Sequence, residues 1–556
     1  MTDKFKDVFK KVKDFKNINK IYDKYYIPDF KIFAFFEALE QNVLKLEKFT
    51  NYLSKERNGV NGHYSDEFLV VALIFRSFFQ ISTGNIGKVI SADENPDLLK
   101  IFKSLSIKTE VSCDHLNRIK RLFLPIKDEF ERFILDLEEK YILILQRSMP
   151  DYYRSFRVKS GSELIPGAEK ILDLVPWHKY FPDSIFEWDE YYSPLLMYKT
   201  LVWSRLKKID GCIQIRNALH EEIELTDGHF RRFGQNLGFM DTIPEKSKLY
   251  DFFKNLENSV IDKTIETHAR ILIKRNTAEP LILTADSTSA KGQNDDPGFS
   301  DDVQEKSNRK KTHKIHAVCD GIGIPLLIHR TQGEMNDMIG FNLYKSELLK
   351  LKTTADEEHR KVIGLALDAG FASTENITWI KQNLKIEPVV WPRNQRGGEL
   401  EMLLHWLENL RKRFRRLKKL KRNTSPDALL KDKVYCNIIK AIEWICTELQ
   451  ASEYDYAKFI ANYLLKIGIH KWFTMYRRRS TIEGTFGIMK SSYHLLKRTP
   501  SQSLPVTGAE NVEKHTALVI IAMQINALYR YLMLQKDSGI LKPTLAFTLK
   551  ELEVDL

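Results

Sequence analysis

Two aspartates in this sequence each end a short apolar run: Asp286 in LILTAD and Asp368 in VIGLALD. Apolar runs of this length, bounded by turn residues, are typical of buried β-strands. Sites in α/β folds form at the carboxyl ends of such strands. If the two strands are neighbours, the carboxylates face one another and repel unless they share a proton or a cation. Their hard oxygens are ligands suited to Mg²⁺ or Mn²⁺.

A third acid lies in the basic segment YRRRSTIEGTFGIMK, residues 476–490. Tyr476 is followed after three, seven and fourteen residues by Arg479, Glu483 and Lys490. At about 100° per residue, these four side chains would share one face of a helix about 21 Å long. A basic face of that length can follow several DNA phosphates. An acid within it is most simply explained as a metal ligand.

The elements that would position these residues alternate in a regular order from about residue 280. Five apolar runs predict strands, and two amphipathic segments predict the helices that separate the last three. The strands are expected at 281–288, 313–321, 324–332, 362–370 and 387–393, and the helices at 337–351 and 374–384. This β-β-β-α-β-α-β order predicts an α/β fold, a mixed five-stranded sheet with helices on both faces.

The sequence divides into five regions by pattern. A helical N-terminal region precedes a second helical region, and the two parts of the α/β core flank a helical, basic segment. The second part of the core carries the Glu483 helix and a C-terminal helix. The expected boundaries are 1–150, 151–275, 276–398, 399–472 and 473–556.

The two N-terminal regions share a plan. Tyr64-Ser65 and Tyr192-Ser193 each precede a long apolar helix, and a basic, aromatic helix follows later in both regions. The second region is therefore interpreted as a repeat of the first. Short helices that end in a basic one suit helix-turn-helix DNA binding, and plain helical scaffolding fits equally well.

Two basic stretches are further candidates for DNA contact. Residues 403–417 place leucines and a phenylalanine along one side of a helix, and the opposite side carries a basic run that includes Arg415 and Lys418. Lys310 and Lys311 stand in KSNRKKTHKIH, directly before a predicted strand. The alternative in both places is a solvated surface, and a net charge of +12 favours DNA for the helix.

Composition narrows the class of protein. The chain has 556 residues, of which 43% are hydrophobic and 29% charged, which is typical of a globular protein and excludes a disordered one. Five scattered cysteines without a CxxC pair argue against a zinc finger or a disulfide framework. Apolar runs stop at about eight residues, well short of the ~18 that span a membrane. We therefore expect a cytoplasmic protein with a polyanionic partner and no membrane association.

The two aspartates and the Tyr476, Arg479, Glu483, Lys490 segment resemble the DDE transposases of prokaryotic insertion sequences. The resemblance is to the subgroup with a Y-x2-R-x3-E-x6-K signature, abbreviated YREK, and the spacing agrees at all four positions. The strand order is similar to the ribonuclease H-like core of that family. DAGFAST after Asp368, HKIHAVCDGIGIPL and GEMND agree with it, and the likeness covers roughly residues 281–534.

The resemblance implies a chemistry and roles for these residues. Asp286, Asp368 and Glu483 would be the catalytic metal ligands, and two Mg²⁺ or Mn²⁺ ions would drive cleavage and strand transfer of DNA. Arg479 and Lys490 would bind phosphates, and Tyr476 would stack on or hydrogen-bond the DNA end. The partners would be the terminal inverted repeats of a transposon and its target DNA, bound by a homodimer associated with the nucleoid.

The 115 residues that separate Asp368 from Glu483 imply an insertion at 399–472, which here is helical and basic. Family members with insertions at this place have β-rich ones. The alternatives to a cut-and-paste transposase are a nuclease or resolvase of the same fold without strand transfer, and a domesticated DNA-binding protein without catalysis. Among the other polar residues, Asp320 is expected to hold a turn and Asp337 to cap a helix, whereas Trp391 is expected to pack in the core.

Overall fold

The structure is a computed structural model. It describes residue 5, residue 27, and residues 29–57, 64–81, 85–91, 96–106, 111–148, 172–181, 192–209, 211–224, 230–232, 234, 237–239, 243–275, 281–292, 300–301, 311–333, 335–393, 398–493, 495–496 and 504–534. Packing divides the chain into two compact units. Unit 1 runs to Val260, apart from residues 160–162, and unit 2 begins at Ile261.

The first part of unit 1 is helical. Its central helix α4 follows Tyr64-Ser65 as the sequence predicts; Ser65 caps it by accepting the N–H of Phe68, and nearly all of its residues are buried. Ser112 caps α7 in the same way. The helices are α2 (Asp29–Glu40), α3 (Val43–Glu56), α4 (Asp66–Phe79), α5 (Ile86–Ser91), α6 (Pro96–Leu105), α7 (Cys113–Leu122) and α8 (Lys127–Ser148).

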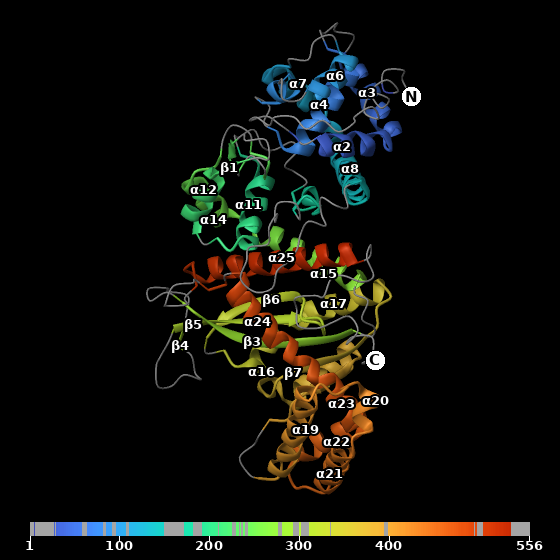
Figure 1. Cartoon of the computed structure of the whole chain (residues 1–556), viewed down its shortest axis with the longest axis vertical. Coiled ribbons are helices and arrows are strands. Elements are labelled where there is room, and N and C mark those ends of the chain that lie inside the picture. The colour runs from blue at the N-terminus through green and yellow to red at the C-terminus, as the bar shows by residue number, and fades with distance from the viewer. Residues whose placement is uncertain are drawn as a thin grey trace. The chain divides into compact units, whose positions relative to one another are not determined.

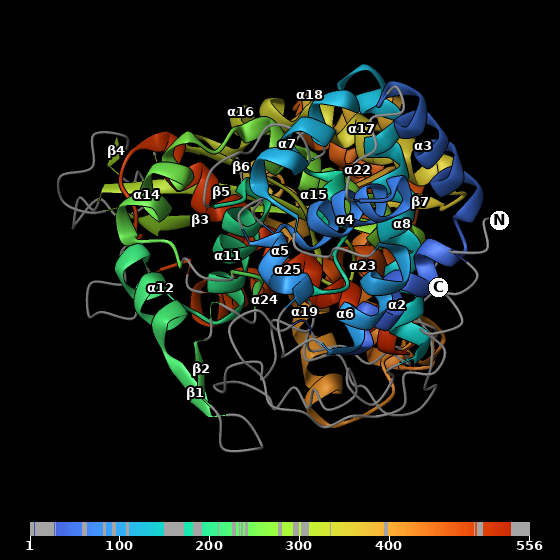
Figure 2. The ribbon, with the colours of Figure 1, turned by 90° about the horizontal axis from the view of Figure 1, so that it is seen from above.

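The second part of unit 1 opens in the same manner, because Ser193 caps α11 (Pro194–Leu206) just as Ser65 caps α4. Two further helices follow, α12 (Gly211–His220) and α14 (Lys246–Asn255). Between them lies a short antiparallel hairpin, β1 (Glu222–Glu224) and β2 (Phe230–Arg232), which continues from the end of α12 (Figure 2). This hairpin is not among the elements expected from the sequence.

Unit 1 buries a cluster of charged side chains. The carboxylate of Asp173 accepts a hydrogen bond of 2.8 Å from Lys31 and lies 3.7 Å from the ammonium of Lys199. Nearby on α8, Glu138 forms an ion pair of 2.8 Å with His178. All of these side chains are at most 16% exposed, so the cluster is enclosed by the core of the unit.

Unit 2 is built on a mixed sheet (Figure 1). The five predicted strands are present and lie in the order β6-β5-β3-β7-β8. A two-residue strand, β4, also pairs with β5. The strands are β3 (Leu281–Lys291), β4 (Ser300–Asp301), β5 (Lys311–Cys319), β6 (Pro325–Gln332), β7 (Val362–Leu367) and β8 (Glu387–Val390). The prediction of a mixed five-stranded sheet is confirmed, and β4 is an addition to it.

Strands β3 and β7 are parallel neighbours, as the two aspartates require. Their register pairs Ala285 with Leu367. Asp286 on β3 and Asp368, directly after β7, are the residues that follow this pair. Hairpin strands β5 and β6 run antiparallel on the other side of β3. The first and fourth predicted strands are thus adjacent, which places both carboxyl groups at one edge of the sheet.

Helices pack on the sheet and contribute side chains to the same hydrophobic core as its strands. Helix α25 packs along β6, and Figure 1 shows it beside α15 on one side of the sheet. Helix α24 packs on β3 and β5, and α23 packs on β7 and β8. The helices outside the 399–472 segment are α15 (Asn258–Arg275), α16 (Asp337–Gly340), α17 (Lys345–Glu357), α18 (Thr374–Trp379), α23 (Ile469–Tyr476), α24 (Ser480–Ser492) and α25 (Ala509–Leu534).

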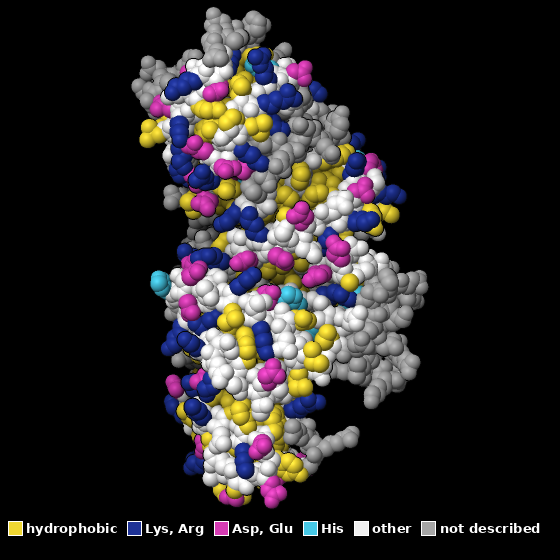
Figure 3. Space-filling view, turned by 180° about the vertical axis from the view of Figure 1, so that it is seen from behind, with side chains coloured by type: hydrophobic (Ala, Val, Ile, Leu, Met, Phe, Trp, Pro, Cys, Tyr) yellow, Lys and Arg dark blue, Asp and Glu magenta, His cyan; other side chains and the backbone are white. Residues whose placement is uncertain are grey.

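The 399–472 segment is helical, as predicted, and consists of α19 (Glu401–Lys419), α20 (Pro426–Leu430), α21 (Lys433–Leu449) and α22 (Asp455–Ile467). The leucine seam of α19 is buried, and α19 packs on α21. In Figure 3 the segment lies at the bottom of the view, where Lys and Arg side chains are interspersed with acidic and hydrophobic ones.

The YREK segment is not one continuous α-helix. Tyr476 ends α23, Arg477–Arg479 form a 3₁₀ turn, and Glu483 and Lys490 lie on α24. The expectation of one uniform α-helix through all four residues is therefore wrong. A 3₁₀ turn rotates by about 120° per residue, so it returns to the same direction after three residues, and Tyr476 and Arg479 still share a side. None of the helices in the described part of the chain is both long enough and apolar enough to cross a membrane.

Candidate active site

The two aspartates are fixed in the same way where the pairing of β3 with β7 stops. Asp368 directly follows β7, as expected, whereas Asp286 lies within β3 and not at its end, because β3 continues to Lys291 alongside β5. In each, one carboxylate oxygen accepts the backbone N–H of the next residue: Ser287 N lies 2.8 Å from Asp286 Oδ1, and Ala369 N lies 2.7 Å from Asp368 Oδ1. The second oxygen of each carboxylate is therefore left to point across the edge of the sheet.

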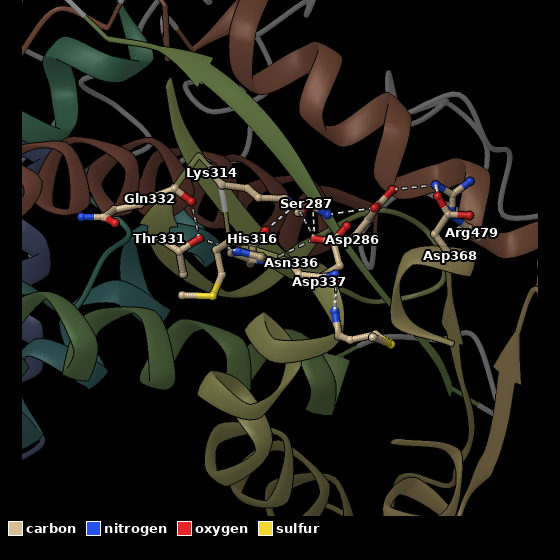
Figure 4. Close-up of polar contacts among 12 residues, drawn as sticks. Asp286, Ser287, Lys314, His316, Thr331, Gln332, Asn336, Asp337, Asp368 and Arg479 are labelled. Atoms are coloured by element: carbon tan, nitrogen blue, oxygen red, sulfur yellow. Dashed lines mark hydrogen bonds and ion pairs between the residues drawn. The ribbon is translucent and has the colours of Figure 1, made fainter. Parts of the chain in front are cut away.

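Arg479 joins these two carboxylates to the third predicted acid. Its Nη2 lies 2.9 Å from both Asp286 Oδ2 and Asp368 Oδ2, and its Nη1 lies 2.8 Å from Glu483 Oε1. Figure 4 shows Asp286, Asp368 and Arg479 meeting at this edge. The structure thus brings the three predicted acids, from β3, β7 and α24, around one guanidinium.

The site is closed on one side and open on the other. The side chains of Asp286 and Arg479 are 11% and 13% exposed, whereas those of Asp368 and Glu483 are 42% and 55% exposed. Burial raises the pKa of Asp286 to about 6, against the opposing effect of Arg479 and the Ser287 N–H. Burial lowers the pKa of Arg479, but the surrounding carboxylates outweigh it and hold that pKa above its usual value.

The donor set fits a divalent cation. Three carboxylates around one positive group carry more negative charge than that group balances, and their oxygens are the ligands that Mg²⁺ and Mn²⁺ prefer. Among the described residues, no three His, Cys, Asp or Glu side chains are close enough to share an ion as they stand. The guanidinium lies between these three carboxylates, so an ion would take its place.

The other two residues of the signature lie in different surroundings. Lys490 donates a hydrogen bond of 2.7 Å to Thr288 Oγ1 on β3, and burial lowers its pKa. Tyr476 is 7% exposed, and its ring packs against Trp472 at 5.2 Å and Trp391 at 4.9 Å. Lys490 therefore borders the site along β3, whereas the ring of Tyr476 belongs to an aromatic stack. The prediction that Trp391 packs in the core is confirmed.

The remaining predicted DNA contacts do not gather at the carboxylates. Arg415 and Lys418 are exposed on α19. Their neighbour Arg413 forms a bidentate pair with Asp432, with distances of 3.0 and 2.6 Å. Lys310 lies outside the described residues, and Lys311 begins β5 with its side chain outside them.

Asp337 is a residue for which the predicted role was wrong. Asn336 caps α16 instead, by accepting the N–H of Met338 at 3.0 Å. Asp337 is the first helical residue, and its carboxylate turns toward the sheet, where it accepts the hydroxyl of Ser287 at 2.7 Å. The expectation for Asp320 is confirmed, because its carboxylate accepts the N–H of Ile324 across the β5–β6 turn.

Comparison with known proteins agrees with this geometry. Residues 277–507 match the family model described as a transposase DDE domain. The match includes Asp286, Asp368 and Glu483, so this segment is similar to the DDE domain of transposases, a family that generally uses divalent metal ions. Searches of curated proteins and of solved structures found no match.

Proposed function

We propose that this protein is a DNA transposase that binds the ends of a mobile element and catalyses metal-dependent strand cleavage and strand transfer. The observation that carries the proposal is the meeting of Asp286, Asp368 and Glu483 at one guanidinium, at the point where the pairing of β3 with β7 stops. The match to the transposase DDE domain covers these residues and supports the same function.

In this proposal Asp286, Asp368 and Glu483 hold two Mg²⁺ or Mn²⁺ ions. When bound, such ions supply an activated water or 3′-hydroxyl and stabilise the leaving oxygen. Asp286 is the most deeply buried of the three acids and would bridge the ions, whereas the more exposed Asp368 and Glu483 would hold one each. Arg479, released from the carboxylates, would bind a phosphate next to the cleaved bond.

The chain's other positive residues would hold the DNA. Lys490 borders β3 two residues from Asp286, at Thr288, and would bind a neighbouring phosphate. The burial of its ring leaves Tyr476 to contribute a hydroxyl rather than a stacking face. Arg415 and Lys418 on α19 would contact the duplex farther from the site.

The same proposal assigns the larger regions. The order β6-β5-β3-β7-β8, with β3 and β7 carrying the acids, supports a ribonuclease H-like core. Helices α19 to α22 would be a helical insertion in that core. The helices of unit 1, in which Ser65 and Ser193 cap α4 and α11 in the same way, would bind transposon ends. A homodimer would join two ends. The reaction of such a dimer would be cut-and-paste transposition. It would take place in the cytoplasm, on the DNA of the nucleoid.

The test is a nicking assay with Mg²⁺ on labelled duplexes that carry the terminal repeats flanking the gene. Wild type is compared with Glu483→Gln and with a control, Glu375→Gln, which alters an exposed glutamate on α18. We expect wild type and the control to nick at the repeat boundary, and Glu483→Gln to bind the repeat without nicking it. Nicking by Glu483→Gln would refute the site. Nicking without a strand-transfer product would favour a nuclease or resolvase, and specific binding without any nicking would favour a domesticated DNA-binding protein.

A further inference from the structure

Asp337 contacts the residue that follows the first candidate ligand. Since Asn336 serves as the helix cap, the Asp337 carboxylate is directed into unit 2, where its Oδ1 accepts the Ser287 hydroxyl at 2.7 Å (Figure 4). The backbone N–H of Ser287 is at the same time bonded to Asp286 Oδ1 at 2.8 Å. Ser287 thus links the two carboxylates through its hydroxyl and its amide.

The same carboxylate also meets the turn that follows the second candidate ligand. A Cβ atom placed on Gly370 would lie 2.8 Å from Asp337 Oδ2, a distance at which something must shift. Gly370 is two residues beyond Asp368, and its lack of a side chain permits this close approach. Asp337 therefore lies against the chain segments that follow both Asp286 and Asp368.

The charge of Asp337 is balanced without the candidate metal ligands. Lys314 on β5 lies 2.9 Å from Asp337 Oδ1 and donates a second hydrogen bond, of 3.0 Å, to the carbonyl of Met335. The two side chains are 11% and 17% exposed, and His316 Nδ1 lies 4.0 Å away. Its Oδ1 is engaged by both Ser287 and Lys314, so Asp337 is tied to the residues that surround the candidate ligands.

We propose that Asp337 is a positioning residue that holds the segments after Asp286 and Asp368 at the separation needed for these two aspartates to bind one ion. This inference rests on the proposed function. Residues that support metal ligands through hydrogen bonds commonly change metal affinity or activity by about 10- to 100-fold when they are replaced. Asn at position 337 keeps the size of the side chain but removes the charge that pairs with Lys314.

The test compares full-length wild type with Asp337→Asn and Ser287→Ala. Asp356→Asn is the matched control, since Asp356 is exposed and pairs with Lys352 on the surface of α17. Mn²⁺ binding is measured by calorimetry, together with the affinity for repeat DNA without metal, the melting temperature and the metal dependence of nicking. We expect Asp337→Asn to bind Mn²⁺ about 10- to 100-fold more weakly and Ser287→Ala to show a smaller loss. DNA affinity should be unchanged in both, and the control should equal wild type.

A folded Asp337→Asn with wild-type Mn²⁺ affinity would overturn the inference, even if nicking were slower. If Asp337→Asn does not fold, the double variant Lys314→Gln/Asp337→Asn removes both charges of the pair and is measured instead. A third variant, Gly370→Ala, displaces Asp337 from the other side and should weaken Mn²⁺ binding as well. Failure of the proposed function is distinct, because wild type itself would then neither bind Mn²⁺ at this site nor nick DNA.

Discussion

Each unit of this protein contains a cluster of ion-paired side chains, and the two clusters differ in composition and in exposure. In unit 1 one carboxylate, Asp173, lies with two lysines, Lys31 and Lys199. In unit 2 one guanidinium, Arg479, lies with three carboxylates. The first cluster is enclosed on all sides, whereas the second has side chains that are 42% and 55% exposed.

The difference separates a structural cluster from a chemical one. Both contain groups with displaced pKa values: burial lowers the pKa of Lys199 to about 8 and raises that of Asp286 to about 6. A displaced pKa alone would point to either cluster. Of the two clusters, the one in unit 2 has a surplus of carboxylates that is open to solvent, and such a surplus can bind a cation. The comparison predicts that charge removal affects chemistry in unit 2 and stability in unit 1.

The largest effect is expected from Asp368→Asn. Loss of this ligand should reduce cleavage at least about 1,000-fold, which corresponds to about 4 kcal/mol in the barrier. Because the side chain of Asp368 is 42% exposed, the free energy of unfolding should change by no more than about 0.5 kcal/mol. Single-turnover nicking and urea denaturation measure the two quantities. A large loss of stability would remove the distinction between the clusters.

The reverse outcome is expected for Asp173→Asn in unit 1. This variant leaves two buried lysines without their counter-charge, and the free energy of unfolding should fall by about 3 kcal/mol. Nicking per folded molecule should remain at the wild-type level. The control is Asp136→Asn, which alters an exposed carboxylate paired with Lys45 and should cost no more than about 0.5 kcal/mol. Equal stability of the two variants in urea would show that the enclosed cluster contributes nothing.

A smaller, pH-dependent effect is expected from Glu138→Gln. Burial lowers the pKa of His178, but the ion pair with Glu138 outweighs it and raises that pKa above the usual 6.5. The stabilisation is thus fully present below pH 6.5 and is lost as the pH rises through the value in the folded protein. Wild-type stability should fall over this interval, and Glu138→Gln should not show the fall.

The pH experiment has a natural upper limit. Urea denaturation is compared between pH 6 and 7.5, since Lys199, with its pKa of about 8, begins to lose its proton above this range. An equally steep fall in wild type and variant would show that the His178–Glu138 pair is not its source.

The smallest effect is expected on α19, where two exposed basic residues, Arg415 and Lys418, can be compared with Arg413, which is less exposed. Replacement of Arg415 and Lys418 by Gln should reduce the slope of log affinity against log salt by up to about 0.9 for each DNA phosphate that is no longer neutralised. Arg413→Gln, which removes the partner of Asp432, should lower stability and leave the slope unchanged. Filter binding at several salt concentrations measures the slope. A slope that falls in Arg413→Gln as much as in the double variant would refute a role for Arg415 and Lys418 in DNA binding.

The sheet and the carboxylates could be predicted because their signals are local. Each strand contains an apolar run, and the adjacency of β3 and β7 follows from the need for the two acids to meet. The end of β3 was misplaced, because its apolar run stops near Asp286 whereas the strand continues to Lys291 alongside β5. The leucine seam of α19 and the presence of a C-terminal helix, α25, were also evident, since helical periodicity over many residues is a strong signal. The β1–β2 hairpin was missed because its strands have three residues each, too few for a periodic pattern.

The details of the site depend on contacts between distant residues. The 3₁₀ turn at Arg477–Arg479 was missed because the angular arithmetic assumes a uniform α-helix. Tyr476 is buried by Trp391, 85 positions away along the chain, so its surroundings could not be inferred from its own segment. The role of Asp337 was misassigned because Asn336 and Asp337 are adjacent and both are favoured helix caps. Sequence alone could not decide which of them turned inward.

The aromatic stack beside the site has a consequence for how the chain can vary. Trp391, just after β8, and Trp472, on α23, have ring centroids 5.8 Å apart. The chain therefore leaves the core after β8 and returns to it at α23, close to the same point. Helices α19 to α22 lie between these two tryptophans in the sequence. Lengthening a closed excursion costs little entropy, because the cost grows only with the logarithm of its length. The stretch between the two tryptophans can therefore change in length at little entropic cost, provided that Tyr463 on α22 continues to accept the hydrogen bond of Val390 N on β8.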